Sequence, residues 1–468
     1  METYESLLAA VTAADGGRPV SDPATGEVLG RAPERGTGDL EQAVAAARTA
    51  QPDWESLGHE ERSRLLNTAA DAVDRSAEAL AHLISREQGK PLNGPGSRFE
   101  AGGVSAWLRA TAATPLEPER VLDDESGQAT LGYRAAGLVG AIGPWNWPAL
   151  IATWQFAPAL RMGNTVVMKP SEHTPLSVLA LAAIVNRVLP EGVLTVLPGG
   201  GDLGAAMVAH PAFDKLMFTG STRTGRAITA ASAANLPRLT LELGGNDPGI
   251  VLPDADPAAI AEDLFWGAFI NTGQTCAALK RLYVHESLHD EVAEALAGVA
   301  ARMPMGPGTD EASMLGPLTT AGQFRIVDDL VAQAAAAGGR LITGGGPDRE
   351  APGNFFPATL VTGPPADAPL VVEEQFGPAL PIIAYSDLDE VITHANALDV
   401  GLGASVWSGD VERAKQVASR IEAGTIWINK HGTVHPMVPF GGVKGSGYGL
   451  EFGAEGLKSV AVPQVIAT

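Results

Sequence analysis

The feature that most constrains the fold is an alternation of short apolar runs with helical patterns between residues 131 and 252. Strands that alternate with helices form parallel sheets, because each helix returns the chain to the end of the sheet where the next strand begins. We therefore predict a parallel α/β sheet here. The apolar runs are Gly137–Ile142, Thr165–Met168, Val193–Leu197 and Lys215–Phe218, and the helical patterns are Ala149–Arg161, Pro175–Val188 and Gly201–His210.

A second alternation begins near residue 243 and predicts a second α/β domain. The length of 468 residues agrees, because one hydrophobic core rarely supports so long a chain. Upstream, Asp39–Ala50 and Glu60–Ser85 have helical patterns. The elements predicted in the second domain are strands at Gly249–Leu252, Arg281–Val284, Pro381–Tyr385, Ala404–Trp407 and Gly424–Asn429, with helices from Pro257 and from Ser287.

The composition excludes some classes of partner. The chain has 32 basic and 54 acidic residues, a net charge of −22, which disfavours binding to nucleic acid phosphates. The start Met1–Glu5 lacks the pattern of a secretory signal, and apolar runs such as Leu138–Ile142 are too short to span a bilayer. The single cysteine allows no internal disulfide. We therefore expect a cytoplasmic protein that binds neither nucleic acid nor membrane.

Cys276, the single cysteine, follows a predicted break in a helix. The helical pattern of Ala261–Ile270 is interrupted at Asn271–Gly273, three residues before the thiol. A cysteine after a glycine-containing turn can face a cleft and act there as a thiolate nucleophile. The alternative is that Cys276 is a small apolar side chain of the core.

Glu242 lies in the segment Leu241–Asp247, next to a pair of glycines at positions 244 and 245. Glycine permits backbone conformations that few other residues adopt. Glu242 is either a strand residue that faces water or, in apolar surroundings, a general base with a raised pKa.

Seven motifs together resemble the aldehyde dehydrogenase superfamily. The pattern Phe-x-x-x-Gly-Gln-x-Cys that ends at Cys276, and Glu-Leu-Gly-Gly from Glu242, resemble its two active-site signatures, and they are 34 residues apart. The resemblance runs from about residue 21 to the end. The other motifs, in the family's order, are Pro144–Pro148, Gly163–Glu172, Phe218–Ser221, Glu374–Pro378 and Pro439–Gly442.

The resemblance implies an α/β aldehyde dehydrogenase-like fold in three parts. Residues 1–116 and 134–242 would form a Rossmann-like NAD-binding domain, and residues 243–440 an α/β catalytic domain. Residues 117–133 and 453–468 would form a small β oligomerisation arm, and the protein would be a homodimer or homotetramer. From the residues alone, the apolar run Val460–Ile466 either pairs with a partner subunit's sheet or packs on its own domain.

The resemblance also implies the catalytic roles. Cys276 would attack the aldehyde, and Asn146 with the Cys276 backbone N–H would stabilise the oxyanion. Hydride transfer to the nicotinamide would leave a thioester, for whose hydrolysis Glu242 would activate water. The alternative for Asn146 is a turn-forming role between Trp145 and Trp147.

The predicted cofactor is NAD. Gly199–Gly204 matches the dinucleotide pattern G-x-G-x-x-G, but the usual acidic residue about 20 positions later is missing. The resemblance places Lys169 and Glu172 at the adenosine ribose instead, and the Glu172 carboxylate would repel the 2′-phosphate of NADP. Ordinary surface charge is the alternative for both. The full predicted set, with Gly220 and Ser221 near the pyrophosphate and Glu374 and Phe376 near the nicotinamide ribose, is Trp145, Lys169, Glu172, Gly201, Gly204, Phe218, Gly220, Ser221, Leu243, Glu374 and Phe376.

The predicted substrate tunnel is aromatic and apolar. Relatives that act on acid semialdehydes carry a cation where this chain has Trp154, so we expect an aliphatic or aromatic aldehyde. A cationic betaine or aminoaldehyde is an alternative, through cation–π attraction, and core packing is the structural alternative. The predicted tunnel residues are Trp147, Ile151, Trp154, Thr275, Ala277, Val434 and Phe440.

Two departures and one false motif complete the sequence evidence. The family usually has lysine where this chain has Asn246, and arginine, which tends to mediate subunit contacts, where it has Leu450. His285–His289 spells the zinc-protease motif H-E-x-x-H, but a strand pattern precedes it and Ser287 with Asp290 predicts a helix start. The two histidines would then not share a helix face, so we predict no metal site.

Three rival functions differ in testable ways. A CoA-acylating dehydrogenase would generally lack the glutamate at position 242. A catalytically silent binding or structural protein on the same scaffold would have no need of Cys276, Asn146 and Glu242, which are all present. A zinc hydrolase, the third rival, would contain bound metal.

Overall fold

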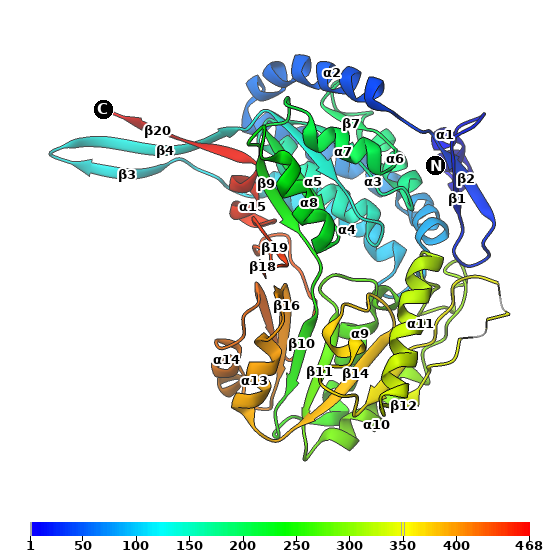
Figure 1. The fold of residues 1–468 in the computed structure, drawn as a ribbon. Coiled ribbons are helices and arrows are strands. Elements are labelled where there is room, and N and C mark those ends of the chain that lie inside the picture. The colour runs from blue at the N-terminus through cyan, green and yellow to red at the C-terminus, as the bar shows by residue number, and fades with distance from the viewer. Residues whose placement is uncertain (1, 348, 351) are drawn as a thin grey trace.

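The computed structural model describes residues 2–347, 349–350 and 352–468, which form two lobes and a projecting arm (Figure 1). The first lobe contains a six-stranded sheet in the order β19-β9-β8-β5-β6-β7. Its five longer strands are parallel, as the alternation predicts, and β19 pairs antiparallel to β9. The strands are β5 (Leu138–Ile142), β6 (Thr165–Lys169), β7 (Leu194–Val196), β8 (Lys215–Thr219), β9 (Arg238–Glu242) and β19 (Gly447–Tyr448).

Helices cover the sheet of the first lobe. Helix α5 is buried along its whole length, which explains why its sequence is apolar on every side. Residues predicted as one or two helices between Glu60 and Ser85 lie in the single helix α3. The elements are α1 (Tyr4–Val11), β1 (Arg18–Ser21), β2 (Val28–Ala32), α2 (Thr37–Ser56), α3 (Gly58–Gln88), α4 (Ser97–Ala113), α5 (Pro148–Arg161), α6 (Pro175–Val185), α7 (Gly201–Ala209) and α8 (Thr222–Ser232).

The second lobe contains a seven-stranded sheet in the order β12-β13-β14-β11-β10-β16-β17, in which β12 is antiparallel to β13 and the other pairs are parallel. Its strands are β10 (Asp247–Val251), β11 (Leu279–His285), β12 (Arg340–Thr343), β13 (Thr359–Thr362), β14 (Ala379–Tyr385), β16 (Gly403–Trp407) and β17 (Thr425–Ile428). Its helices are α9 (Pro257–Phe269), the 3₁₀ turn η1 (Ile270–Gly273), α10 (His289–Ala300), α11 (Ala321–Ala336), α12 (Pro369–Val372), α13 (Leu388–Asn396) and α14 (Val411–Ala418).

The arm is a three-stranded antiparallel sheet of β3 (Glu119–Asp124), β4 (Gly127–Ala135) and β20 (Ala461–Ala467) (Figure 1). Strand β20 pairs with β4 of its own chain. The predicted bounds need two corrections: β4 extends to Ala135, and Gly453–Ser459 is the helix α15 rather than strand. Strands β15 (Val400–Gly401) and β18 (Val443–Lys444) form a small two-stranded sheet. Strand β18 comes shortly before β19 in the chain.

One predicted helix start is wrong. Helix α10 begins at His289 rather than at Ser287, and Leu288 occupies the N-cap position. Ser287 does not cap the helix because its hydroxyl lies 2.8 Å from Nδ1 of His285, with which it forms a hydrogen bond. Within the described ranges, no helix combines the length and the apolar character needed to cross a membrane.

Candidate active site

A cavity of about 660 Å³ lies between the two lobes, a volume typical of small-molecule sites. Its first-lobe wall comes from the carboxyl ends of β5, β6, β8 and β9 and from α7 and α8, and its second-lobe wall includes Cys276 and Glu374. Every residue predicted from the sequence as catalytic or cofactor-binding lines this cavity. They are Trp145, Asn146, Lys169, Glu172, Gly201, Gly204, Phe218, Gly220, Ser221, Glu242, Leu243, Cys276, Glu374 and Phe376.

A strained turn carries Cys276 into the cavity. Asn271 and Thr272 in η1 have φ values of 50° and 55°, in the left-handed region that costs a non-glycine residue about 1–3 kcal/mol. The Asn271 side chain supports the turn by donating to the backbone carbonyl oxygens of Asn146 and Gln274 at 2.9 and 3.3 Å. The thiol is partly covered, and burial raises the pKa of Cys276 to about 12.

Asn146 lies in the loop between β5 and α5, directly before the helix N-cap Trp147. Its Nδ2 donates to the carbonyl oxygen of Gln274 at 3.0 Å, which ties this loop to the segment of Cys276. An amide nitrogen carries two hydrogens, so one N–H remains available to an oxyanion beside the thiol. This placement supports the predicted oxyanion role beyond turn formation alone.

A buried ion pair that sequence reasoning missed holds the Asn146 loop. Lys90 Nζ, at 0% exposure, donates to Glu100 Oε2 at 2.6 Å and to the carbonyl oxygen of Asn146 at 2.8 Å. Glu100 Oε1 also accepts the backbone N–H groups of Ala149 and Leu150 at the start of α5. The sequence signal was weak, because Lys90 and Glu100 look like ordinary surface charges until the helices pack together.

Glu242 ends β9 with its side chain inside the protein, at 5% exposure. Among the described residues, nothing donates a hydrogen bond to either carboxyl oxygen. Burial, and next the charge of Glu451, which is also buried, raise the pKa of Glu242 well above its ordinary value. The apolar surroundings that the sequence hypothesis required for a general base are therefore present.

The two glycines after Glu242 allow close approach of the second lobe. A Cβ at Gly244 would lie 2.3 Å from Oε2 of Glu374. A Cβ at Gly245 would lie 3.1 Å from the carbonyl oxygen of Cys276. A side chain at Gly244 would displace the carboxylate of Glu374, and one at Gly245 would first meet Oδ1 of Asp247 at 2.7 Å.

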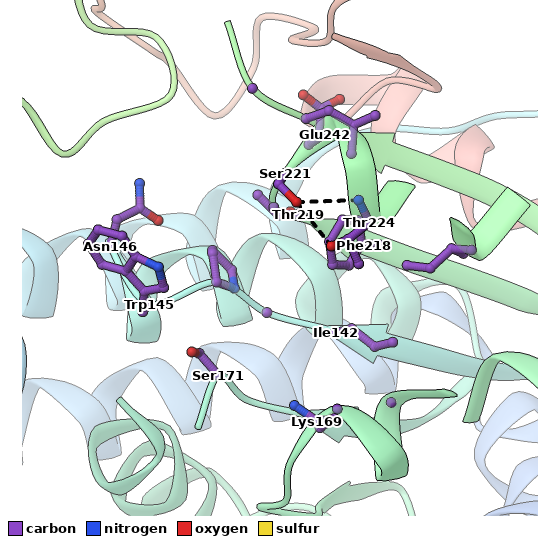
Figure 2. Close-up of a pocket in the computed structure, with 18 of the residues that line it drawn as sticks. Ile142, Trp145, Asn146, Lys169, Ser171, Phe218, Thr219, Ser221, Thr224 and Glu242 are labelled. Carbon is purple, nitrogen blue, oxygen red and sulfur yellow. Dashed lines mark hydrogen bonds between the residues drawn. The ribbon is translucent and has the colours of Figure 1, made fainter. Parts of the chain in front are cut away.

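The other end of the cavity has the charges expected at a ribose. Lys169, at the end of β6, is buried and lies with Nζ 3.7 Å from Oε2 of Glu172, and burial lowers the pKa of this lysine. Figure 2 shows Lys169 and Ser171 at the bottom of the view, and Glu242 at the top. Apolar residues of α7 and α8 line the cavity here: Ala205, Val208, Ala227, Ile228 and Ala231.

Helix α8 points its N-terminus into the cavity. Ser221 is its N-cap and accepts a hydrogen bond from the backbone N–H of Thr224 at 3.3 Å (Figure 2). Backbone N–H groups at a helix start favour anions, as the pyrophosphate role of Gly220 and Ser221 requires. Phe376 contacts Trp145 edge to face at 5.3 Å and has a strained φ of 43°. The carboxylates of Glu172 and Glu374, the start of α8 and the apolar residues of α7 and α8 all line one cavity, as the predicted dinucleotide site requires.

The predicted tunnel residues lie in an aromatic cluster beside Cys276. All of them except Thr275 belong to it, and the Thr275 hydroxyl accepts the indole N–H of Trp147 at 3.0 Å. The cluster also contains Trp107, 5.5 Å from Trp154, and Phe452, 4.8 Å from it. These seven residues do not line the dinucleotide cavity. The structure thus brings them together and leaves the core-packing alternative open.

The H-E-x-x-H motif and the two departures have plain structural settings. His285 ends β11 and His289 begins α10, so the histidines do not share a helix face, as predicted. Asn246 is buried and donates from Nδ2 to the carbonyl oxygen of Val371 at 3.0 Å. Leu450 is 38% exposed on the single chain.

Another cation that the sequence hypothesis passed over is Lys280, four residues after Cys276 and 1% exposed at its side chain. A lysine that follows the apolar run Ala277–Leu279 was the available signal, since such a residue needs a buried partner.

Comparisons with known proteins agree with this geometry. The chain is 39% identical to phenylacetaldehyde dehydrogenase of Pseudomonas fluorescens, over 94% of this chain and 90% of that protein. It is also 39% identical to retinal dehydrogenase 2 of Mus musculus, over 94% and 86%. The crystal structure of PnpE in complex with nicotinamide adenine dinucleotide superposes with a TM-score of 0.93 at 36% identity, over 98% of this chain and 95% of that one.

The profile of the Aldehyde dehydrogenase family matches residues 11–466. Members of this family are oxidoreductases that use NAD or NADP. The match covers both lobes and nearly all of the arm, and it includes each residue placed in the cavity above. The chain therefore belongs to the aldehyde dehydrogenase family, whose fold it has, and it is an oxidoreductase that acts on the aldehyde group.

Proposed function

We propose that this enzyme oxidises an apolar aliphatic or aromatic aldehyde to the carboxylic acid, with NAD as the oxidant and Cys276 as the nucleophile. One observation carries the proposal: Cys276, Asn146 and Glu242 line the same cavity as the residues that suit a dinucleotide. Each lies on a different segment, so only the folded chain brings the three together.

The first half of the reaction builds a thioester. The Cys276 thiolate bonds to the aldehyde carbon, and the carbonyl π electrons move to the oxygen. The free N–H of Asn146 and the backbone N–H of Cys276 stabilise this oxyanion, at about 3–4 kcal/mol for each donor. Bound NAD supplies the acceptor for the hydride that leaves this carbon, and loss of the hydride leaves a thioester on Cys276.

The second half hydrolyses the thioester. Glu242 removes a proton from water as the water oxygen bonds to the acyl carbon. The carbon–sulfur bond then breaks, the carboxylic acid leaves and the sulfur is again a thiolate. Because burial and Glu451 raise the pKa of Glu242, its carboxylate is a stronger base than an exposed one.

The preference for NAD over NADP rests on Glu172. Its carboxylate, beside the buried Lys169, accepts hydrogen bonds from a ribose 2′-hydroxyl and repels a 2′-phosphate. Lys169 would offset part of that repulsion. Gly201 and Gly204, the other predicted cofactor residues at this end, lie on α7. A Cβ at Gly204 would come 3.6 Å from the Lys169 side chain, so α7 packs beside this lysine.

The aromatic cluster supports the apolar substrate class. Its side chains, among them Trp147, Trp154 and Phe440, offer apolar surface next to Cys276. The named substrates of the relatives, phenylacetaldehyde and retinal, are also largely apolar. A betaine or aminoaldehyde remains the second candidate because aromatic faces attract cations.

We also propose that the two lobes divide the work as the sequence predicts. Residues 1–116 and 134–242 would bind the dinucleotide, residues 243–440 would carry the nucleophile, and the arm would join subunits into a dimer or tetramer. The arm supports this by presenting Val465 and Ile466 of β20 at 57% and 66% exposure. The cytoplasmic location stays a prediction.

The test is NADH formation at neutral to alkaline pH with hexanal, benzaldehyde, succinic semialdehyde and betaine aldehyde, each with NAD or NADP. We expect turnover of hexanal or benzaldehyde with NAD and without CoA, and none in Cys276→Ala. Turnover that requires CoA would overturn the role of Glu242. Highest kcat/KM for betaine aldehyde would favour the second candidate, and no turnover of any aldehyde would point to a silent scaffold.

A further inference from the structure

Lys280 connects the segment of the nucleophile Cys276 with the carboxylate of Glu374. It is the second residue of β11, and its side chain is 1% exposed. Its Nζ donates to the carbonyl oxygens of Thr275 and Cys276 at 2.9 and 3.1 Å, and to Oε1 of Glu374 at 3.1 Å. An ammonium group has three N–H donors, so these three contacts satisfy it completely.

The contact with Lys280 determines which carboxyl oxygen of Glu374 is left without a donor from Lys280 or Gly245. Oε1 also accepts the backbone N–H of Gly245 at 3.3 Å, so this oxygen has two donors. The other oxygen, Oε2, lies against Gly244, which lines the cavity as Glu374 does. Lys280 thus orients the carboxylate that the family resemblance places near the nicotinamide ribose.

The charge of Lys280 also acts on the thiol. Burial raises the pKa of Cys276, and the carboxylates of Glu242, Glu374 and Asp247 raise it further, whereas the charge of Lys280 lowers it. Asp247 is buried beside this group, and no described residue donates to its carboxyl oxygens. A buried cation in this acidic setting favours the thiolate form of the nucleophile.

Position 246 carries no charge in this chain. The family resemblance expects lysine at 246, directly after Gly245, whose N–H contacts Glu374. This chain has Asn246, which donates to Val371 instead. Lys280 approaches the same carboxylate from β11 and supplies a positive charge that Asn246 lacks.

We propose that Lys280 is a positioning residue of this enzyme, whose ammonium ties Glu374 to the backbone of Cys276 and so holds the ribose carboxylate and the nucleophile in a fixed relation. The part that concerns the nicotinamide ribose rests on the proposed function. The part that concerns the thiol rests on the hydrogen bonds and charges around Nζ alone.

The experiment compares Lys280→Met and Lys280→Arg with the native enzyme, and Lys415→Met as a control at an exposed lysine paired with Glu412. The first readout is the rate of Cys276 alkylation by iodoacetamide from neutral to alkaline pH, without aldehyde or cofactor. We expect the midpoint to move to higher pH in Lys280→Met, with alkylation roughly tenfold slower at a fixed pH below the midpoint for each unit of pKa. Lys280→Arg should restore most of the rate because it keeps the charge.

The second readout is the Kd for NAD, measured by quenching of tryptophan fluorescence. We expect several-fold weaker binding in Lys280→Met, because Glu374 loses the donor that orients it. An unchanged alkylation profile and an unchanged Kd in a folded Lys280→Met would overturn the proposal. If Lys280→Met does not fold, Lys280→Gln decides, since it keeps N–H donors without the charge and its alkylation must still shift.

The two proposals fail in different ways. A shifted alkylation profile in a protein that oxidises no aldehyde would leave the role of Lys280 at the thiol intact and would refute the proposed function. Normal aldehyde oxidation by an enzyme whose Lys280→Met variant behaves like the native protein in both readouts would refute Lys280 alone.

Discussion

At the residue scale, the proposed chemistry depends on carboxyl groups that the fold keeps from water. Glu242 and Glu451 are 5% and 3% exposed, and the pKa of each is raised by burial. Lys215 is buried nearby and donates to the Thr240 hydroxyl at 2.6 Å, and burial lowers its pKa to about 7. Buried groups whose pKa values are shifted in this way can bind and release protons within the working pH range. An exposed glutamate, which is ionised throughout that range, cannot.

The first prediction at this scale concerns pH. A raised folded-state pKa means that Glu242 stays protonated at pH values where an ordinary glutamate is ionised, and only the carboxylate can activate water. The rate of thioester hydrolysis should therefore rise with pH through a midpoint well above that of an exposed carboxyl. The measurement is single-turnover acid release from the native enzyme across neutral and mildly acidic pH.

Glu242→Gln is the control for this prediction. It should keep the first burst of NADH, lose about 10²- to 10⁴-fold in steady-state rate and lose the pH dependence of hydrolysis. Glu412→Gln, on the exposed helix α14, should behave like the native enzyme. Hydrolysis in Glu242→Gln at the native rate and with the native pH profile would contradict the assignment.

At the element scale, helix starts and loop anchors place the reactive groups. Glu100 on α4 accepts the first backbone N–H groups of α5 and pairs with Lys90, which in turn holds the carbonyl oxygen of Asn146. The Lys90 ammonium also lies 3.4 Å from the ring centroid of Trp147. The position of the proposed oxyanion donor is therefore set by two residues that do not line the cavity.

Glu100→Gln should test this arrangement. It leaves Lys90 buried without a carboxylate, and breaking a buried pair costs about 3–5 kcal/mol. We expect a drop of that size in the free energy of unfolding by urea, with a lower kcat as the Asn146 loop shifts. Glu412→Gln, at an exposed pair, should change stability by less than about 1 kcal/mol. Equal effects of the two substitutions would refute the anchoring role of Glu100.

At the scale of the whole molecule, the projecting arm leaves apolar side chains exposed that nothing else in the described part of the single chain covers. Its strands β3 and β20 expose Val121, Val465 and Ile466, at 48% or more. Apolar side chains on a narrow sheet are better buried in an oligomer than left in water. The exposed Leu450 would then contribute packing where the family usually has arginine.

We expect Val465→Lys combined with Ile466→Glu to weaken subunit assembly. Sedimentation velocity should show a dimer or tetramer for the native chain and smaller species for the variant, because charges at a buried interface must lose their hydration. Thr468→Lys, at the chain end, is the matched control. A variant that assembles like the native chain would show that this end of β20 lies outside the subunit interface.

The sequence by itself determined the periodic and local features. Apolar runs and helical patterns predicted both parallel sheets because the periods of strands and helices are properties of the local chain. The motifs around Cys276, Glu242 and Asn146, read with the family resemblance, named the residues that line the cavity. The Asn271–Gly273 break likewise predicted the turn before the thiol.

Only the tertiary structure decided the features that depend on distant partners. Helix α15 formed within a segment predicted as strand. The anchoring roles of Lys90 and Lys280 depend on carboxylates ten and 94 residues away. A lysine looks the same in sequence whether water or a buried carboxylate surrounds it, and only packing determines which one does.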